Sequence, residues 1–66
     1  MKIKIGQLFS YTPSYDETKD RIIMITEIHG HNVRFMLVDS GDTKMTSRKG
    51  ILDGLRRGFL RLASKE

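Results

Sequence analysis

The sequence predicts a mainly β fold, a small and strongly bent antiparallel sheet with one short helix near its C-terminal end. Three observations predict it. Apolar residues alternate or cluster in short β-branched runs, glycine-containing turns separate those runs, and the apolar spacing becomes helical after Ser47. We expect three to five strands in a single domain over residues 1–66, because a bent sheet of this kind hides its edges by closing toward a barrel.

The first strand is expected within "KIKIGQLFSY", where apolar residues share one parity: Ile3, Ile5, Phe9 and Tyr11. Gly6 interrupts this alternation, and a bulge or a sharp bend is expected there. The polar stretch from Thr12 to Asp20 contains the only proline and predicts a loop.

Two longer strands are expected in "RIIMITEI" and "NVRFMLVD", which are apolar on both parities at their centres. Such strands are typical of a sheet covered on both faces, by the core on one side and by a helix, a bent neighbouring strand or a partner on the other. A second turn, Asp39 to Thr43, contains a glycine and leads into a short strand over about 43–46.

The two long strands are joined by His29-Gly30-His31-Asn32. Gly30 can supply the positive φ of a type II′ turn, or His31-Asn32 can form a tighter variant. Zinc sites usually need three or four ligands, and a catalytic histidine needs a nucleophile and an orienting partner. Because neither set surrounds these histidines, we expect solvated turn residues and no metal.

The helix is expected over about 47–57 with Ser47 as N-cap. Five apolar residues fall within a stripe about 100° wide on a helical wheel: Ile51, Leu52, Leu55, Phe59 and Leu62. Gly50, Gly54 and Gly58 disfavour a long helix. Two alternatives remain open, a helix that extends to residue 63, or one broken at Gly58 and followed by a closing strand "FLRLA".

The net charge of +4 arises entirely in the last third of the chain. Residues 44–66 carry seven Lys or Arg and two acids, whereas residues 1–43 carry five and six. A one-sided basic region favours an anionic partner such as nucleic acid. The candidate nucleic-acid-binding residues are six cations and one aromatic expected to be exposed in a loop: Lys44, Arg48, Lys49, Arg56, Arg57, Arg61 and Tyr15. Tyr11 and Phe35 are candidate stacking residues as well, although both are expected in the core.

An enzyme is not expected. The chain has no cysteine, no phosphate-binding glycine loop and no nucleophile with a base, and a domain this small is expected to have little room for a pocket of about 300 Å³. No catalytic residue and no cofactor are therefore predicted. No apolar run reaches the roughly 20 residues that span a bilayer, and the N-terminus does not have the pattern of a signal peptide, so a cytoplasmic protein is expected.

The order of elements, from "IKIGQLFSY" through "DRIIMITEIHGHNVRFMLVDSGDT" to "TSRKGILDGLRRGFLRL", resembles the small SH3-like β-barrels of the KOW and Tudor kind, in particular short accessory proteins of tailed bacteriophages. That resemblance implies a binding module for nucleic acid or protein. A second, local similarity covers twelve residues, "EIHGHNVRFMLV", and is to the central hairpin of small dimeric RNA-binding translational regulators of the carbon-storage type. Their basic opening strand is missing here, which favours convergent hairpin chemistry.

Two functions are therefore weighed. The first is a small basic module that binds nucleic acid, DNA or RNA, through its C-terminal face. The alternative is a protein-binding modulator or inhibitor of a host complex, acting through an exposed strand edge or an apolar face. A homodimer that buries the second faces of the long strands is compatible with either.

Overall fold

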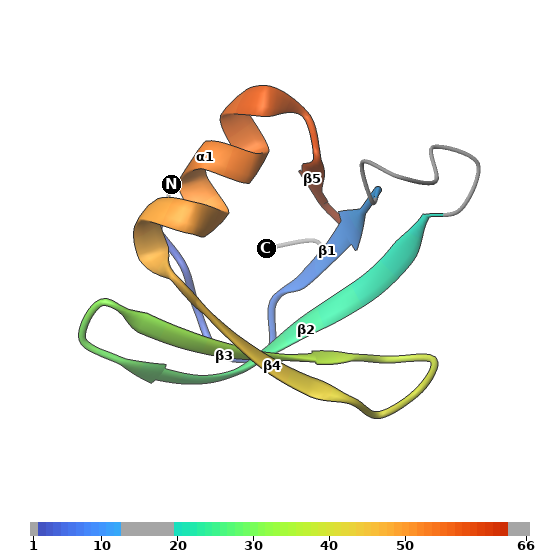
Figure 1. Cartoon of the computed structure of the whole chain (residues 1–66), viewed down its shortest axis with the longest axis horizontal. Helices are drawn as coiled ribbons and strands as arrows, with labels where there is room; N and C mark the ends of the chain where they lie inside the picture. Colours follow the sequence, from blue (N-terminus) through green and yellow to red (C-terminus); the bar gives the residue numbers. More distant parts are fainter. Residues whose placement is uncertain (1, 13–19, 64–66) are drawn as a thin grey trace.

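The computed structural model describes residues 2–12 and 20–63. These residues form one five-stranded antiparallel sheet and one helix (Figure 1). The elements in chain order are β1 (Leu8–Tyr11), β2 (Arg21–His29), β3 (Asn32–Leu37), β4 (Thr43–Ser47), α1 (Arg48–Arg57) and β5 (Leu60–Leu62). The mainly β class with one short helix is thus confirmed.

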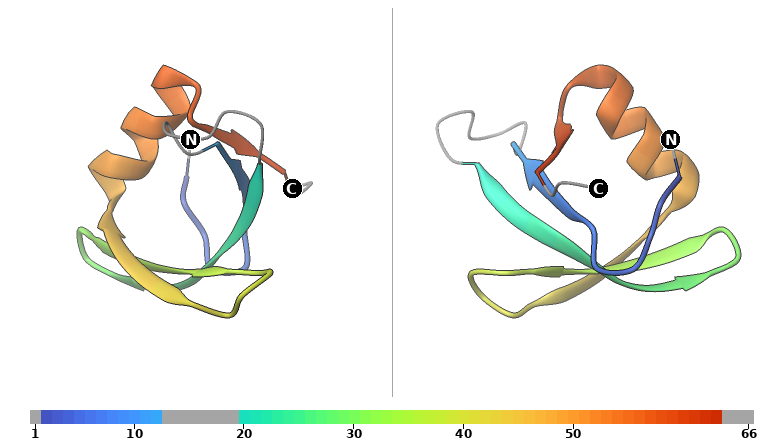
Figure 2. Two further views of the ribbon diagram at one scale, coloured as in Figure 1. Left: turned by 45° about the vertical axis from the view of Figure 1, so that its right-hand side comes forward. Right: turned by 180° about the vertical axis from the view of Figure 1, so that it is seen from behind.

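The sheet is strongly bent but not closed. Its strand order is β4-β3-β2-β1-β5, so β4 and β5 are the two edges. The chain passes from one edge to the other through α1, which contacts both edge strands and lies across the open side of the sheet (Figure 2). The helix therefore occupies the place where a further strand pairing would close a barrel.

The N-terminal segment turns before the sheet begins. Gly6 has a φ of 89°, and its N–H donates to the Ile25 carbonyl at 2.7 Å. Because the chain reverses here, the alternation predicted across Gly6 is wrong: Ile3 is buried, whereas the Ile5 side chain is 66% exposed. The buried side chain of Gln7 holds the segment, accepting from the Lys4 N–H at 2.9 Å and donating to the Lys2 carbonyl at 3.3 Å.

The long hairpin β2–β3 contains a β-bulge. Ile25 pairs with Phe35 and Glu27 pairs with Arg34, so Thr26 is the extra residue. Its hydroxyl donates to the Arg34 carbonyl at 3.2 Å. The bulge keeps apolar residues on the inner, concave face of the sheet on both sides of it, because Ile25 is buried and Ile28 also packs against the core.

The outer face of the sheet is not covered by any described part of the chain, contrary to the expectation of two buried faces. Ile22 on β2 is 37% exposed, and Val38, just after β3, is 47% exposed. Met45 on the edge strand β4 is 55% exposed. The sequence pattern had indicated burial on both sides because both parities are apolar, but α1 covers the inner face only.

The turn at Gly30-His31 is a two-residue hairpin. Gly30 has a φ of 62°, His29 pairs with Asn32, and no described non-glycine residue has a positive φ. Positive φ at the first central residue alone is the property of a type II′ turn, so the first of the two predicted alternatives is confirmed.

Helix α1 begins and ends as its caps require. The Ser47 hydroxyl accepts from the Gly50 N–H at 3.0 Å, which confirms the predicted N-cap. Gly58 ends the helix with a φ of 87°, and its N–H donates to the Leu55 carbonyl. The chain then forms β5, so the alternative of a helix broken at Gly58 and followed by a strand is the observed one.

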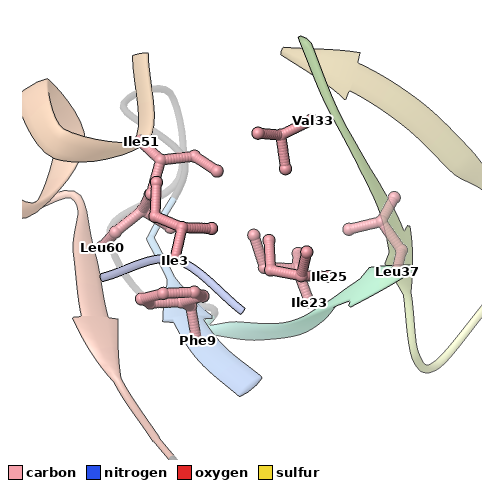
Figure 3. Close-up of a cluster of buried hydrophobic side chains, with 8 residues drawn as sticks. All are labelled: Ile3, Phe9, Ile23, Ile25, Val33, Leu37, Ile51 and Leu60. Carbon is pink, nitrogen blue, oxygen red and sulfur yellow. The ribbon is translucent and has the colours of Figure 1, made fainter. Parts of the chain in front are cut away.

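The core lies between the inner face of the sheet and α1 (Figure 3). Its buried side chains come from the N-terminal segment, the first three strands, α1 and β5: Ile3, Phe9, Ile23, Ile25, Val33, Leu37, Ile51 and Leu60. Of the predicted helical stripe, Ile51 is buried and Leu55 half-buried, but Leu52 is 44% exposed. Phe59 and Leu62 lie beyond the C-terminal end of α1, so the prediction that they share its apolar stripe was wrong.

Candidate nucleic-acid interface

A groove of about 560 Å³ lies between α1 and the inner face of the sheet. The expectation that so small a domain lacks room for a pocket is therefore wrong. The groove exists because the sheet stays open and α1 stands off it between β4 and β5. Buried core residues, Ile23, Leu37 and Ile51, contribute to its lining.

Three aromatic residues from different elements line this groove. Tyr11 comes from β1, Phe35 from β3 and Phe59 from the link between α1 and β5. Tyr11 and Phe35 also pack against the core, as the sequence predicted, but both are only partly buried. Phe59 is 40% exposed. The groove therefore offers aromatic surface that solvent reaches, and of its three aromatic residues Phe59 is the one that the sequence analysis had not considered for stacking.

Two cations of the candidate set, Lys44 and Arg57, line the same groove. Lys44 pairs with Phe35 in the β3–β4 ladder, so both side chains lie on the inner face, with Cβ atoms about 4.5–5.5 Å apart. Arg57 comes from the last turn of α1, and its Nε lies 3.3 Å from the Asp53 carboxylate. Lys44 is exposed and forms no ion pair with any described residue.

Arg21 also lines the groove, although the sequence analysis had not selected it. Its guanidinium forms a forked pair with Asp39, at 3.0 and 3.3 Å. The hydrogen bond from Arg21 holds the pKa of the Asp39 carboxyl below its ordinary value of 3.8, and the favourable charge of Arg21 acts in the same direction. Arg21 is thus neutralised by Asp39, which leaves Lys44 and Arg57 as the other two cations of the groove lining.

The remaining candidate cations have different surroundings. Arg56 extends from α1 and shares Asp53 with Arg57, with an Nη2–Oδ1 distance of 2.6 Å. Lys49 is exposed on the first turn of α1 and has no ion pair within the described part of the chain. Both lie outside the groove lining but on the same helix as Arg57.

Arg48 and Arg61 serve other contacts. Arg48 donates from its backbone N–H to the His31 carbonyl at 2.9 Å and from its Nε to the Gly30 carbonyl at 2.7 Å. Arg61, on β5, pairs with Asp20 at 3.3 Å. Tyr15, the last member of the predicted set, lies outside the described residues. Five of the seven thus lie on β4 and α1. Apart from Arg48, which contacts the β2–β3 turn, these are Lys44, Lys49, Arg56 and Arg57.

The histidines at the hairpin tip are not part of a metal-binding cluster among the described residues. His29 is exposed and lies 3.6 Å from one carboxylate, that of Glu27, which itself pairs with Arg34 at 3.1 Å. Over residues 2–12 and 20–63, no cluster of three or more His, Cys, Asp or Glu side chains could hold a metal ion. The same residues contain no helix of the length and apolarity that a bilayer crossing needs.

Comparison with known proteins gave no match to a protein family, to a curated protein sequence or to a solved structure.

Proposed function

We propose that this protein is a small, non-enzymatic module that binds nucleic acid through a basic face made by β4 and α1. The observation that carries the proposal is the charge of this segment. Residues 43–57 contain five cations and one acid, a net charge of +4 that equals the charge of the whole chain. Because cations at this density attract phosphates, the face fits a polyanion better than an ordinary protein surface.

The geometry supports phosphate contact by four of these cations. Lys44 and Lys49 are exposed and have no ion pair with the described residues, while Arg56 and Arg57 share a single carboxylate. Exposed ion pairs of this kind are worth little, so a phosphate can replace Asp53 at small cost. The resemblance to SH3-like barrels of the KOW and Tudor kind, some of which bind nucleic acid, agrees with this assignment.

The test is fluorescence anisotropy with labelled single- and double-stranded DNA and RNA at about 50 and 200 mM salt, the range over which phosphate contacts change affinity strongly. We expect salt-sensitive binding by the native chain. The double variant Arg56→Ala, Arg57→Ala should weaken binding to every sequence and reduce the slope of log K against log salt by up to about 1.4 to 1.8, which is two phosphate contacts.

The matched control is Lys2→Ala with Lys4→Ala, which removes the same net charge from exposed positions in the N-terminal segment, outside β4 and α1. If both double variants weaken binding equally, net charge alone governs it and the proposed face is wrong. If the native chain binds no nucleic acid at about 50 mM salt, the proposed function itself is wrong.

A second function, a protein-binding modulator, is favoured by one specific observation. The outer face of the sheet presents Ile22, Val38 and Met45 to solvent, and β4 and β5 are edge strands that could accept a strand from a partner. If this face joins two copies, sedimentation will detect a species heavier than the 7.6 kDa chain, and Val38→Lys will abolish it. A monomer at high concentration would exclude the homodimer.

A further inference from the structure

We infer that the groove between α1 and the sheet holds an unpaired nucleotide of a single-stranded nucleic acid, with its base against Phe59 and Phe35 and its phosphate at Lys44 and Arg57. This inference rests on the proposed function and specifies which form of nucleic acid the face selects. Its starting point is that aromatic side chains line the same groove as Lys44, a cation with no ion pair to any described residue.

The first argument concerns shape. The candidate stacking residues line a groove between α1 and the inner face of the sheet, Phe35 from the sheet and Phe59 from the link after α1. In a duplex the base faces are covered by their neighbours in the stack, so they cannot reach such a surface without unpairing. A single strand can turn a base outward into the groove, which is how proteins that bind single strands use aromatic residues.

The second argument concerns the spacing of aromatic and cationic groups. Lys44 and Phe35 are directly paired across β3 and β4, so the two side chains leave the backbone side by side on the same face of the sheet. Base and phosphate are likewise neighbours within one nucleotide. Arg57 and Phe59 give the same combination from the opposite wall, two residues apart at the end of α1.

The third argument concerns charge balance. The groove lining contains three cations and one acid: Arg21, Lys44, Arg57 and Asp53. Arg21 is held by Asp39 outside the lining, and Asp53 is shared between Arg56 and Arg57. Lys44 is therefore the cation of this groove that has no ion pair within residues 2–12 and 20–63, and an anion beside Phe35 would supply one.

The experiment compares matched variants of the full chain on a labelled ten-nucleotide single strand and on the duplex of the same sequence. Phe59→Ala should weaken single-strand binding at least fivefold, since one stacked base contributes about that much or more. Phe59→Leu, which keeps apolar volume without an aromatic face, should restore little of it. Leu52→Ala is the control, because Leu52 is similarly exposed, at 44% against 40%, and lies outside the groove.

The lysine pair gives an independent readout. Lys44→Gln should weaken single-strand binding more than Lys49→Gln, although both changes remove one exposed charge. Circular dichroism on each variant confirms that the fold is retained; Phe59 is outside the buried core, so its truncation should not unfold the chain.

The outcomes separate the inference from the function beneath it. Equal or tighter binding to the duplex, or no difference between Phe59→Ala and Leu52→Ala, would overturn the single-strand assignment while the basic face survives. If adenosine monophosphate competes as well as the single strand, a free nucleotide and not a strand occupies the groove. If poly-glutamate of equal charge competes as well, the face does not select nucleic acid. No binding of any nucleic acid by the native chain would remove both proposals.

Discussion

The two ends of α1 carry the same type of residue and use it differently. At the N-terminal end, Arg48 donates to two carbonyls of the β2–β3 turn, and Ser47 caps the helix. At the C-terminal end, the side chains of Arg56 and Arg57 are 77% and 62% exposed, and within the described part of the chain both pair with Asp53 alone, one turn back on their own helix. One end fixes the fold and the other is available to a ligand.

This difference shows why counting the cations in the sequence overestimates how many of them can bind a ligand. A cation in the first turn is disfavoured by the helix dipole, whereas one in the last turn is favoured. The first turn of α1 nevertheless contains no acid and begins with Arg48-Lys49. For Arg48 the Gly30 carbonyl compensates, because it accepts a hydrogen bond from the guanidinium. Lys49 has no such partner among the described residues, which makes it the better candidate of the two for contact with an external anion.

The largest expected effect tests whether the N-terminal half of α1 is the anchored one. Ile51 is 1% exposed in the core, so Ile51→Ala should lower the free energy of unfolding by about 2–5 kcal/mol. Leu55→Ala, at a half-buried site in the second half, should cost less. Urea denaturation followed by circular dichroism measures both. Leu52→Ala is the surface control, with an expected change within about 0.5 kcal/mol. Equal losses of unfolding free energy for Ile51→Ala and Leu55→Ala would show that the two halves of α1 are anchored to the same extent.

A smaller effect tests the arginines themselves. Arg48→Met should lower the free energy of unfolding by about 1 kcal/mol, because the Gly30 carbonyl loses a charged donor. Arg56→Met should change it by less than about 0.5 kcal/mol, since an exposed ion pair contributes little. Chemical denaturation of the two variants side by side gives the answer. A reversed order would mean that the C-terminal arginines stabilise the fold and are less free to bind.

The smallest expected effect concerns the ion pair between Arg21, which lines the groove, and Asp39. Because the fold lowers the pKa of Asp39, it favours the ionised carboxylate. The resulting stabilisation is present above the ordinary pKa of 3.8 and is lost as the pH falls through the lower, folded value.

Asp39→Asn should therefore lower the melting temperature slightly near pH 7, and the difference from the native chain should vanish toward about pH 2. Asp42→Asn is the control in the same turn, since its carboxylate forms no ion pair with the described residues. A deficit of Asp39→Asn that persists at the acidic end would show that the ion pair is not its cause.

Local patterns predicted the elements of this fold well. The β-branched run of β2, the Gly30 turn and the Ser47 cap each act within a few residues, so the sequence displays them directly. Ile5 was wrongly predicted to be buried with Ile3, because a positive φ at Gly6 reverses the chain. A pattern of alternating residues assumes a continuous strand and so cannot reveal a turn within it. Leu52 was predicted to belong to the buried stripe of the helix but is exposed, because a helical wheel does not show which part of an apolar stripe faces the sheet.

The candidate site was predicted only in part. The groove takes its aromatic residues from β1, β3 and the link after α1, so it arises from tertiary structure alone. The contact of Arg48 with the Gly30 carbonyl joins positions 18 residues apart and has no local signal. The sharing of Asp53 was readable, however: Arg56 and Arg57 follow it by three and four residues, the spacing of helical ion pairs.

Thr26 is the residue that the β2–β3 pairing passes over. If β2 ran through this point as a regular strand and kept Thr26, Glu27 would turn toward the core and Ile28 toward solvent, because side chains alternate strictly along a regular strand. Deleting Thr26 would not exchange these faces, since Ile25, Glu27 and Ile28 would then alternate as they already do. The bulge therefore accommodates one surplus residue in β2, and its loss would leave unchanged which side chains of the hairpin tip face α1.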